Sequence, residues 1–359
     1  MEEEMSKELL EIYTDYLITQ NHYATATGLS TVLDGEISHD KVTRFLSRND
    51  CGSKELWGIT KPTVREIESE SGVLCLDDSV VEKAYTDEND IICWHYSHAK
   101  GRVMKGMNLL SCMVRYGDVA LPIGFEIIQK TCRYSDLETR RERRKSNISK
   151  NELFRGLIQQ AIDNGVKFKY ALADNWFSSK DNIAFLHADL KKYFIFGIKS
   201  NRTVAISAKD KQQGKFQQVR QLELEDGQTN TVYLKGLDFP VQLQKKVFKN
   251  ENGSTGVLYL ATNDITIDAD LMYQIYQKRW RIEEYHKSIK QNAALGKSPT
   301  RTVRTQTNHV FASIVAYVKL EKLKLKTNMN HFAIRYKLIV KANQIAFKEL
   351  QIMKNKFAA

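Results

Sequence analysis

The order of strand-like and helix-like segments constrains the fold of this chain more than any other feature. Three apolar runs with the length and alternation of strands come first, at residues 73–85, 91–99 and 107–128. Gly117 and Asp118 form a turn signal inside the third run, which divides it into a hairpin. We expect these runs to pair as an antiparallel meander.

The pattern then changes to an alternation of helix and strand. A helix is predicted near residues 150–163, a strand that ends at Asp174 follows it, a second helix covers 179–190, and a further strand covers 193–200. Three strands followed by helix, strand, helix and strand are typical of an α/β fold of the ribonuclease-H-like (retroviral-integrase-like) type. We therefore expect a mixed sheet with helices on both faces.

Residues 201–257 interrupt this order. They are rich in Gln, Lys and Thr and contain short alternating runs around the turn signals DGQ and ENG, which predicts an antiparallel β-strand insertion. A core-like strand at 258–264 then resumes the sheet. The expected regions are a small helical, helix-turn-helix-like N-terminal domain over 1–65, the first part of the core over 66–200, the insertion over 201–257, the second part of the core with a Glu-bearing helix over 258–325, and a basic helical segment over 326–359.

Residues 23–48 have the spacing of a helix-turn-helix. They form two short helical patterns around a turn at Asp34, and Ser38 is placed to cap the second helix. In that helix Lys41 and Arg44 would stay free for a DNA groove or for phosphates. An ordinary helical hairpin is the alternative, because the sequence signature of this motif is weak.

The charge balance indicates a polyanionic partner. Lys and Arg outnumber Asp and Glu by 54 to 43, which gives a formal net charge of +11 at pH 7, and such an excess favours phosphate polymers through counterion release. Basic residues cluster at 140–145, 276–290 and 300–305. A solvated surface explains any one such cluster, but several in one chain favour nucleic acid as the partner.

The cysteines and the apolar runs argue against several other classes of protein. Five cysteines without a CxxC pair indicate neither a disulfide framework nor a zinc ribbon. No apolar run reaches the roughly 18 residues that span a bilayer, and the acidic start of the sequence lacks the features of a secretory signal. We therefore expect a cytoplasmic protein without a membrane anchor.

Acidic residues follow two of the predicted core strands. Asp77 and Asp78 lie at the end of the first strand and Asp174 at the end of another, and the strand ends in such sheets converge at one edge. A carboxylate directly after an apolar run is unfavourable unless it is paired or binds a metal ion. Water-facing caps explain any single Asp equally well. Together with Glu283, these residues predict a site for Mg²⁺, which favours a few carboxylate ligands.

The segment YQKRWRIEEYHKSIK, at residues 276–290, has the pattern of one amphipathic helix. Three isoleucines recur every seven positions and would face the core: Ile275, Ile282 and Ile289. Four other side chains fall in one arc at the edge of that stripe: Tyr276, Arg279, Glu283 and Lys290. Bound cations would activate a phosphodiester bond of the DNA for displacement. Arg279, Lys287 and Lys290 would bind the phosphates beside that bond. A solvated helix face with an ordinary Arg279–Glu283 pair is the alternative.

The same four side chains carry a family resemblance. Tyr276, Arg279, Glu283 and Lys290 are separated by two, three and six residues, which is the Y-(2)-R-(3)-E-(6)-K signature. The motifs LDDS and LADNWF precede them in the expected order, and a β insertion separates the second motif from the signature. Over residues 25–320 the chain resembles bacterial insertion-sequence DDE transposases of the insertion-sequence-four-like group.

The resemblance implies a catalytic metal site. The three catalytic acids and metal ligands would be Asp77, Asp174 and Glu283, with Asp78 as a rival for the first position. The metal ion would be Mg²⁺, or Mn²⁺ in its place, and no organic cofactor is implied.

The resemblance also implies contacts with DNA. Tyr276, Arg279 and Lys290 would contact the DNA backbone near the cleavage site, and Trp280 matches a position beside the flipped base of hairpin-forming members. Those members stack that base on a Trp of the insertion. The insertion of this chain contains no Trp, so a hairpin intermediate stays an open question. Five aromatic residues in or next to the insertion offer a π-face instead: Phe216, Tyr233, Phe239, Phe248 and Tyr259.

The activity that the resemblance implies is cut-and-paste DNA transposition. The enzyme would cleave DNA at the ends of its element and join the freed 3′-hydroxyls to target DNA, as a homodimer that holds two double-stranded ends with inverted repeats. It would act in the bacterial cytoplasm, at the nucleoid. Two alternatives stay open: a ribonuclease-H-like DNA nuclease or resolvase without strand transfer, and a non-catalytic, domesticated DNA-binding protein.

Overall fold

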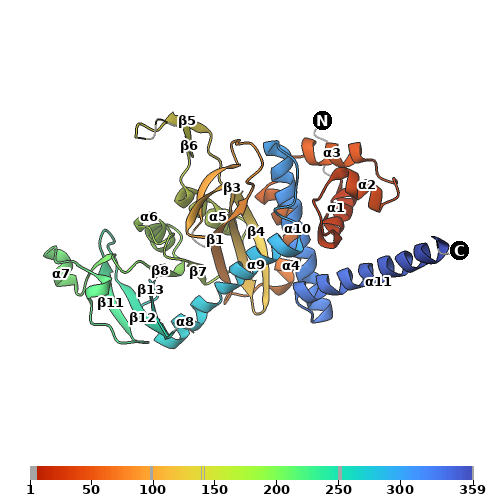
Figure 1. Cartoon of the computed structure of the whole chain (residues 1–359). Helices are drawn as coiled ribbons and strands as arrows, with labels where there is room; N and C mark the ends of the chain where they lie inside the picture. Colours follow the sequence, from red (N-terminus) through yellow and green to blue (C-terminus); the bar gives the residue numbers. More distant parts are fainter. Residues whose placement is uncertain (1–5, 98–99, 139, 141, 250–252, 358–359) are drawn as a thin grey trace.

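The computed structural model describes residues 6–97, 100–138, 140, 142–249 and 253–357, and Figure 1 shows their arrangement. Within these residues 11 strands form one sheet and two more form a separate ribbon. Five strands make up the centre of the large sheet: β1 (Val73–Glu82), β3 (Arg102–Tyr116), β4 (Val119–Ile127), β7 (Tyr170–Ala173) and β8 (Tyr193–Ile198).

The central strands lie in the order β4-β3-β1-β7-β8 and combine both directions of pairing. β3 is antiparallel to β1 and to β4, whereas β7 runs parallel to β1 and to β8. The turn predicted at Gly117 and Asp118 joins β3 to β4. The sheet is therefore mixed, as expected, and it is consistent with a ribonuclease-H-like α/β fold.

The expected meander is wrong in the position of one strand. β2 (Cys93–Ser97) pairs with the first residues of β3, so β3 lies between β1 and β2. The cause is the length of β3, whose 15 residues pair with β2 over Arg102–Gly106 and with β4 from Leu109 onward. Of the run predicted over 91–99, residues 98 and 99 lie outside the described residues.

Helices cover both faces of the central strands. Those that follow β4 in the chain and pack near the sheet are α5 (Lys150–Asp163), α6 (Lys180–Ala184), α8 (Ala269–Gln277), α9 (Trp280–Asn292) and α10 (Val303–Thr327). Leu76 of β1 belongs to a core that includes α5, whereas Cys75 belongs to a core that includes α9 and α10. Since neighbouring side chains of a strand point to opposite faces, α5 and α9 lie on opposite sides of β1.

The predicted helices of this region are confirmed with one correction. The helix expected near 150–163 is α5, and residues 180–189 are helical, with a π-helical turn from Phe185 to Asp189. The single helix expected over 276–290 is instead two helices, because α8 ends at Gln277 and α9 begins at Trp280. The apolar stripe nevertheless faces the core as predicted, with no more than 7 % exposure of its three isoleucines.

Four helices form the N-terminal part of the chain: α1 (Lys7–Thr19), α2 (Ala26–Val32), α3 (His39–Arg48) and α4 (Ser53–Ile67). The two helices expected over 23–48 are α2 and α3, and Ser38 Oγ accepts a hydrogen bond from Lys41 N at 3.3 Å as the N-cap of α3. α1 and α3 pack on α10, where the Tyr13 hydroxyl lies 2.9 Å from His309 Nδ1. Helix α4 packs on β4.

Five more strands extend the sheet beyond β8: β9 (Thr203–Ala205), β10 (Gln217–Gln218), β11 (Thr229–Leu234), β12 (Val241–Lys249) and β13 (Thr255–Thr262). β13 is antiparallel to β8, and the order continues through β12, β11, β9 and β10. The short helix α7 (Ala208–Gln212) accompanies them. These strands lie on the opposite side of the molecule from the N-terminal helices (Figure 1).

A two-stranded ribbon, β5 (Cys132–Ser135) and β6 (Glu142–Lys145), projects between β4 and α5 in the chain. Arg144 Nη1 joins it to the rest of the protein through an ion pair with Asp90 Oδ1 at 2.6 Å. Of the basic stretch 140–145, Arg141 lies outside the described residues.

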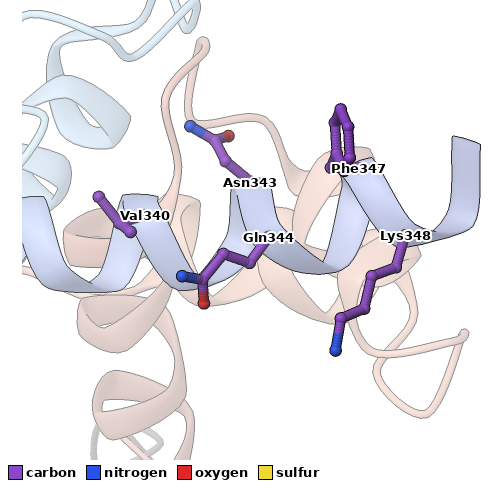
Figure 2. A pocket seen from close by; sticks show the side chains of 5 residues that line it. All are labelled: Val340, Asn343, Gln344, Phe347 and Lys348. Carbon is purple, nitrogen blue, oxygen red and sulfur yellow. The ribbon is translucent and has the colours of Figure 1, made fainter.

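Helix α11 (His331–Phe357) begins against the protein and then leaves it as a long arm (Figure 1). Ile334 in its first turn is 6 % exposed, whereas residues 341–356 are exposed throughout. Figure 2 shows five side chains of the arm that border a surface pocket: Val340, Asn343, Gln344, Phe347 and Lys348. Among the described residues, no helix combines the length and the apolar character that crossing a membrane requires.

Candidate active site

Asp77 and Asp78 lie within β1 and not at its end as expected, because β1 continues to Glu82. Strand β7 pairs with β1 only over Val73–Cys75. The two acids therefore lie just beyond the last residue of β1 that pairs with β7. Strand β7 ends near this level, whereas β1 continues.

The two aspartates point to opposite faces of the sheet, because side chains alternate along a strand. Asp77 shares the face of Cys75 and is 8 % exposed. Asp78 faces α5, where its Oδ1 accepts a hydrogen bond from Lys150 Nζ at 2.8 Å. Of the two rivals, Asp77 is thus the one that faces Glu283 on α9.

Arg279 lies between Asp77 and Glu283. Its Nη1 is 3.4 Å from Asp77 Oδ2 and 3.3 Å from Glu283 Oε1. The guanidinium carbon also lies 5.6 Å from the centre of the Tyr276 ring. A single cationic group therefore bridges the carboxylate of β1 and the carboxylate of α9.

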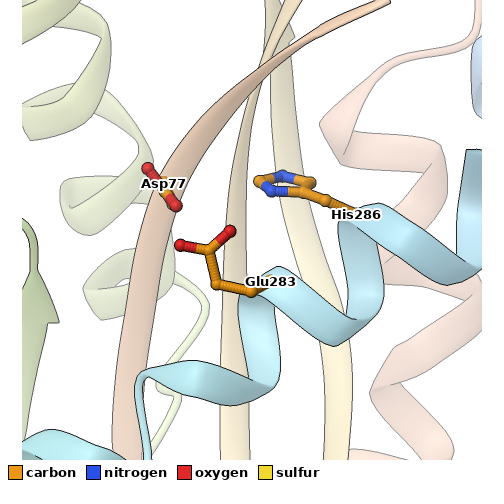
Figure 3. Close-up of side chains that lie close together, drawn as sticks. All are labelled: Asp77, Glu283 and His286. Carbon is orange, nitrogen blue, oxygen red and sulfur yellow. The ribbon is translucent and has the colours of Figure 1, made fainter. Parts of the chain in front are cut away.

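His286 adds a third potential metal ligand to Asp77 and Glu283. One ligand atom of each residue lies within 4.8 Å of the other two, and Figure 3 shows the three side chains directed toward one another. His286 is 4 % exposed, its Nε2 lies 3.4 Å from Ser111 Oγ, and burial lowers its pKa to about 3. His286 was not among the predicted ligands, although its position one turn after Glu283 on the same helix is a signal that the sequence contains.

Asp174 approaches the site from the neighbouring strand. It directly follows β7, as predicted, and its Oδ1 accepts a hydrogen bond from Trp176 N at 2.9 Å. It does not belong to the group of ligand atoms around Asp77 that was found among the described residues. Its negative charge nevertheless acts on Asp77, whose pKa it raises.

Burial and repulsion both favour the protonated form of Asp77. Burial is the largest of the causes that raise its pKa well above the ordinary value, and the negative charges of Asp174 and Glu283 raise it further. The positive charge of Arg279 lowers this pKa. Burial also raises the pKa of Asp174. The site therefore concentrates more negative charge than its own arginine neutralises.

Two of the predicted DNA-contacting residues lie at this cluster together with Arg279. Lys290 Nζ is 2.5 Å from Ser79 Oγ, two residues beyond Asp77 on the same face of β1, and burial lowers the pKa of this lysine. Tyr276 is 8 % exposed and lies beneath Arg279. The structure thus brings together the side chains of the Y-(2)-R-(3)-E-(6)-K signature.

The other predicted DNA-contacting residues lie outside the cluster. Trp280 is 65 % exposed at the start of α9. Lys287 Nζ lies 5.2 Å from the ring centre of Phe332, and so it faces the first turn of α11. Lys41 and Arg44 are exposed on α3, in the N-terminal helices.

The arrangement fits a divalent cation. Carboxylate oxygens are the ligands that hard cations prefer, a neutral imidazole such as that of His286 can also bind a metal ion, and the excess negative charge would be neutralised by one. A carboxylate cluster flanked by arginine and lysine is also suited to phosphate groups, since the basic side chains can donate charge-assisted hydrogen bonds to them.

Comparisons with known proteins agree with this fold. A family model described as "DDE superfamily endonuclease" matches residues 2–225, and a model described as "Transposase DDE domain" matches residues 142–319. The chain belongs to the DDE superfamily of endonucleases. Together the two matches support a DDE-type insertion-sequence transposase, an enzyme of DNA transposition whose domain uses divalent metal ions.

The resemblance noted in the sequence is confirmed at this level, and its narrower subgroup stays a prediction. A search of curated proteins found no match.

Proposed function

We propose that the chain is a Mg²⁺-dependent cut-and-paste transposase of the insertion-sequence-four-like group. It cleaves double-stranded DNA at the inverted repeats of its element and joins the freed 3′-hydroxyls to target DNA. The observation that carries this proposal is the convergence of Asp77, Arg279 and Glu283 on one face of β1, with Asp174 at the end of the adjacent strand.

The proposed catalytic acids and metal ligands are Asp77, Asp174 and Glu283, with two Mg²⁺ ions or Mn²⁺ in their place. When bound, such ions activate the attacking oxygen and stabilise the leaving oxygen of an in-line phosphodiester displacement. Asp78 is the weaker candidate, because it points to the other face and pairs with Lys150. His286 is placed to orient Glu283 or to add a nitrogen ligand.

The basic residues of the cluster position the DNA. Arg279 donates hydrogen bonds to two carboxylates in the free protein. Once those carboxylates bind metal, its planar guanidinium can form a bidentate contact with a phosphate. Lys290 exchanges its contact with Ser79 for a second phosphate. Tyr276 supports the guanidinium from below, so its part in DNA binding is mainly to orient Arg279.

The remaining predicted contacts lie farther from the reacting bond. Trp280 offers an exposed ring to the bases, and Lys287 offers a charge to the backbone. Lys41 and Arg44 on α3 bind the duplex of the transposon end as part of a DNA-binding region over residues 1–65. Residues 201–257 act as an insertion into the core, and two chains form a homodimer on the paired ends in the bacterial cytoplasm.

The decisive experiment is strand cleavage and joining by the purified protein on a duplex that carries an end of its element. It is done with Mg²⁺, with Ca²⁺, and with Asp174→Ala as the control variant. Release of a 3′-hydroxyl with Mg²⁺, followed by joining and absent in the variant, is the expected result. Cleavage without joining would identify a nuclease or resolvase, and binding without cleavage would identify a non-catalytic DNA-binding protein.

A further inference from the structure

Arg279 is paired with the same carboxylates that a metal ion would need as ligands. Its Nη1 is 3.4 Å from Asp77 Oδ2 and 3.3 Å from Glu283 Oε1. Asp77 and Glu283 are also two of the three side chains whose possible ligand atoms come together in the candidate active site. Within the part of the chain that the structure describes, no other Lys or Arg forms an ion pair with either carboxylate.

The charge of Arg279 acts on the third proposed metal ligand as well. Burial raises the pKa of Asp174, and the positive charge of Arg279 lowers it. The Arg279 side chain is only 12 % exposed, and its guanidinium carbon lies 5.6 Å from the centre of the Tyr276 ring. One buried cationic group therefore compensates part of the negative charge of all three proposed metal ligands.

A metal ion and this guanidinium compete for two physical reasons. A divalent cation such as Mg²⁺ binds the oxygen lone pairs of carboxylates directly, and Arg279 already donates hydrogen bonds to one oxygen of Asp77 and one of Glu283. Two positive charges that share the same carboxylates also repel each other, and burial strengthens this repulsion. A metal ion therefore binds Asp77 and Glu283 tightly only when Arg279 has left them.

A phosphate group of DNA is suited to draw Arg279 away from the carboxylates. Two oxygens of a phosphate match the donor nitrogens of a guanidinium, which favours a bidentate contact. The Glu283 side chain is 42 % exposed, and Trp280 near it at the start of α9 is 65 % exposed. The cluster is therefore open to solvent at α9, where a DNA strand can reach the guanidinium.

We infer that Arg279 couples metal binding to DNA binding. In the free protein the guanidinium is an internal cation that keeps the affinity of the carboxylates for divalent metal ions low. A DNA phosphate binds the guanidinium in place of the carboxylates, which then become available to metal ions. Metal ions in turn strengthen DNA binding by the same factor, because such coupling is reciprocal. This inference rests on the proposed function, since a phosphate at the carboxylates is what releases Arg279.

The first test measures the affinity of the full chain for Mn²⁺ in the absence of DNA. Free Mn²⁺ gives an electron paramagnetic resonance signal that weakens on binding, so a titration yields the dissociation constant. Arg279→Gln should bind Mn²⁺ at least about tenfold more tightly than the unmodified chain, a factor within the usual range of coupling between sites. Adding Asp77→Asn to that variant should remove the gain, which locates the Mn²⁺ at the carboxylates.

Lys290→Gln is the matched control for the loss of one positive charge. Lys290 Nζ contacts Ser79 Oγ, two residues beyond Asp77 on the same face of β1, and it forms no ion pair with Asp77 or Glu283 within the described residues. The affinity of Lys290→Gln for Mn²⁺ should therefore rise much less than that of Arg279→Gln. An equal rise would show that charge alone determines the affinity, and it would overturn the inference.

The second test adds a duplex with an already cleaved end of the element, which leaves no bond to cleave. The unmodified chain should then bind Mn²⁺ about tenfold more tightly, after correction for the Mn²⁺ that the duplex binds by itself. Arg279→Gln should lose this enhancement, because its carboxylates are available without DNA. An enhancement that persists in full in Arg279→Gln would overturn the inference, since direct contact between phosphate and metal would then explain it.

Circular dichroism verifies that each variant is folded, and Arg279→Met, which keeps an apolar stem, replaces Arg279→Gln if that variant is unfolded. An Mn²⁺ affinity that neither substitution changes would overturn the inference. The proposed function is judged separately, by Mg²⁺-dependent cleavage and joining. A chain that cleaves and joins DNA while Arg279→Gln gains no affinity for Mn²⁺ keeps the function and loses the coupling. A chain that shows both effects on Mn²⁺ binding but does not cleave DNA keeps the coupling and loses the function.

Discussion

Asp77 is a buried carboxylate that faces two other carboxylates and one arginine. It is 8 % exposed, the charges of Asp174 and Glu283 raise its pKa, and Arg279 opposes that rise without reversing it. The ionised form of Asp77 therefore destabilises the metal-free protein. A divalent cation would turn the same charge into a stabilising contact.

The Asp77→Asn variant should consequently be more stable than the unmodified chain in EDTA at neutral pH. Because the folded-state pKa of Asp77 is raised, the destabilisation is present in full above that pKa and disappears as the pH falls through it. The gain in melting temperature should thus shrink in acid, and Mg²⁺ should stabilise the unmodified chain more than the variant. Differential scanning fluorimetry measures both effects.

Asp238→Asn is a suitable comparison for that experiment, since the Asp238 side chain is fully exposed and its removal should change the melting temperature little. A melting temperature of Asp77→Asn below that of the unmodified chain in EDTA would contradict the electrostatic account of the site.

Glu283 allows a test of metal binding in which the side chain keeps its size and loses only its charge. Glu283→Gln should keep the binding of transposon-end DNA intact or strengthen it, because a charge that repels phosphates is gone. Cleavage should fall by at least about a hundredfold, since even residues behind the metal ligands contribute tenfold to a hundredfold. Gel-shift and strand-cleavage assays measure the two effects.

Glu284→Gln is the control for Glu283→Gln, because Glu284 is exposed and pairs with Arg281 away from the site. It should cleave DNA normally. Retention of cleavage in Glu283→Gln would remove Glu283 from the essential ligands.

At the scale of elements, the junction between α8 and α9 decides where Arg279 points. Arg279 N donates to Tyr276 O at 2.9 Å, and Ile282 N donates to Arg279 O at 2.9 Å, so the helical hydrogen bonds change to an i to i−3 pattern there. Lys278 O at the same junction accepts from Arg115 Nη1 at 3.3 Å. A partner 163 residues away in the chain thus stabilises the break, which explains why the local apolar pattern predicted a single helix.

Helix α3 was more accessible to prediction, because its boundaries depend on local hydrogen bonds. Ser38→Ala removes the side-chain acceptor for Lys41 N and should lower the free energy of unfolding by about 1 kcal/mol. Ser47→Ala in the last turn of the same helix is the control, since Ser47 is no cap there and Ala favours a helix. Chemical denaturation compares the variants, and an unchanged stability of Ser38→Ala would contradict the capping role.

At the scale of the whole molecule, the arm of α11 stands apart from the rest. Residues 341–356 are exposed, including the apolar side chains of Ile345, Phe347, Leu350 and Met353. Apolar residues spread widely around an exposed helix need a partner to be buried. The arm therefore contributes little to the folding of a single chain.

A chain that ends at Val340 should accordingly keep the melting temperature of the full chain in dilute solution. Thermal unfolding with sedimentation velocity on the same samples measures stability and oligomeric state together. A fall of several degrees in the melting temperature would show that the arm is packed in solution, against a second copy if the full chain sediments as a dimer.

The sequence by itself determined the order of the core strands and of the helices between them, the cap of α3, the face of α9 that is buried and the acidic and basic residues of the candidate site. These features depend on local periodicity and on residue chemistry, which neighbouring positions in the chain reveal. The tertiary structure alone decided the place of β3 between β1 and β2, the break before Trp280, the choice of Asp77 over Asp78 as the residue that faces Glu283, and the arrival of His286 and Trp176 beside the carboxylates. Each of these depends on contacts between residues far apart in the chain, whose pairing no local pattern specifies.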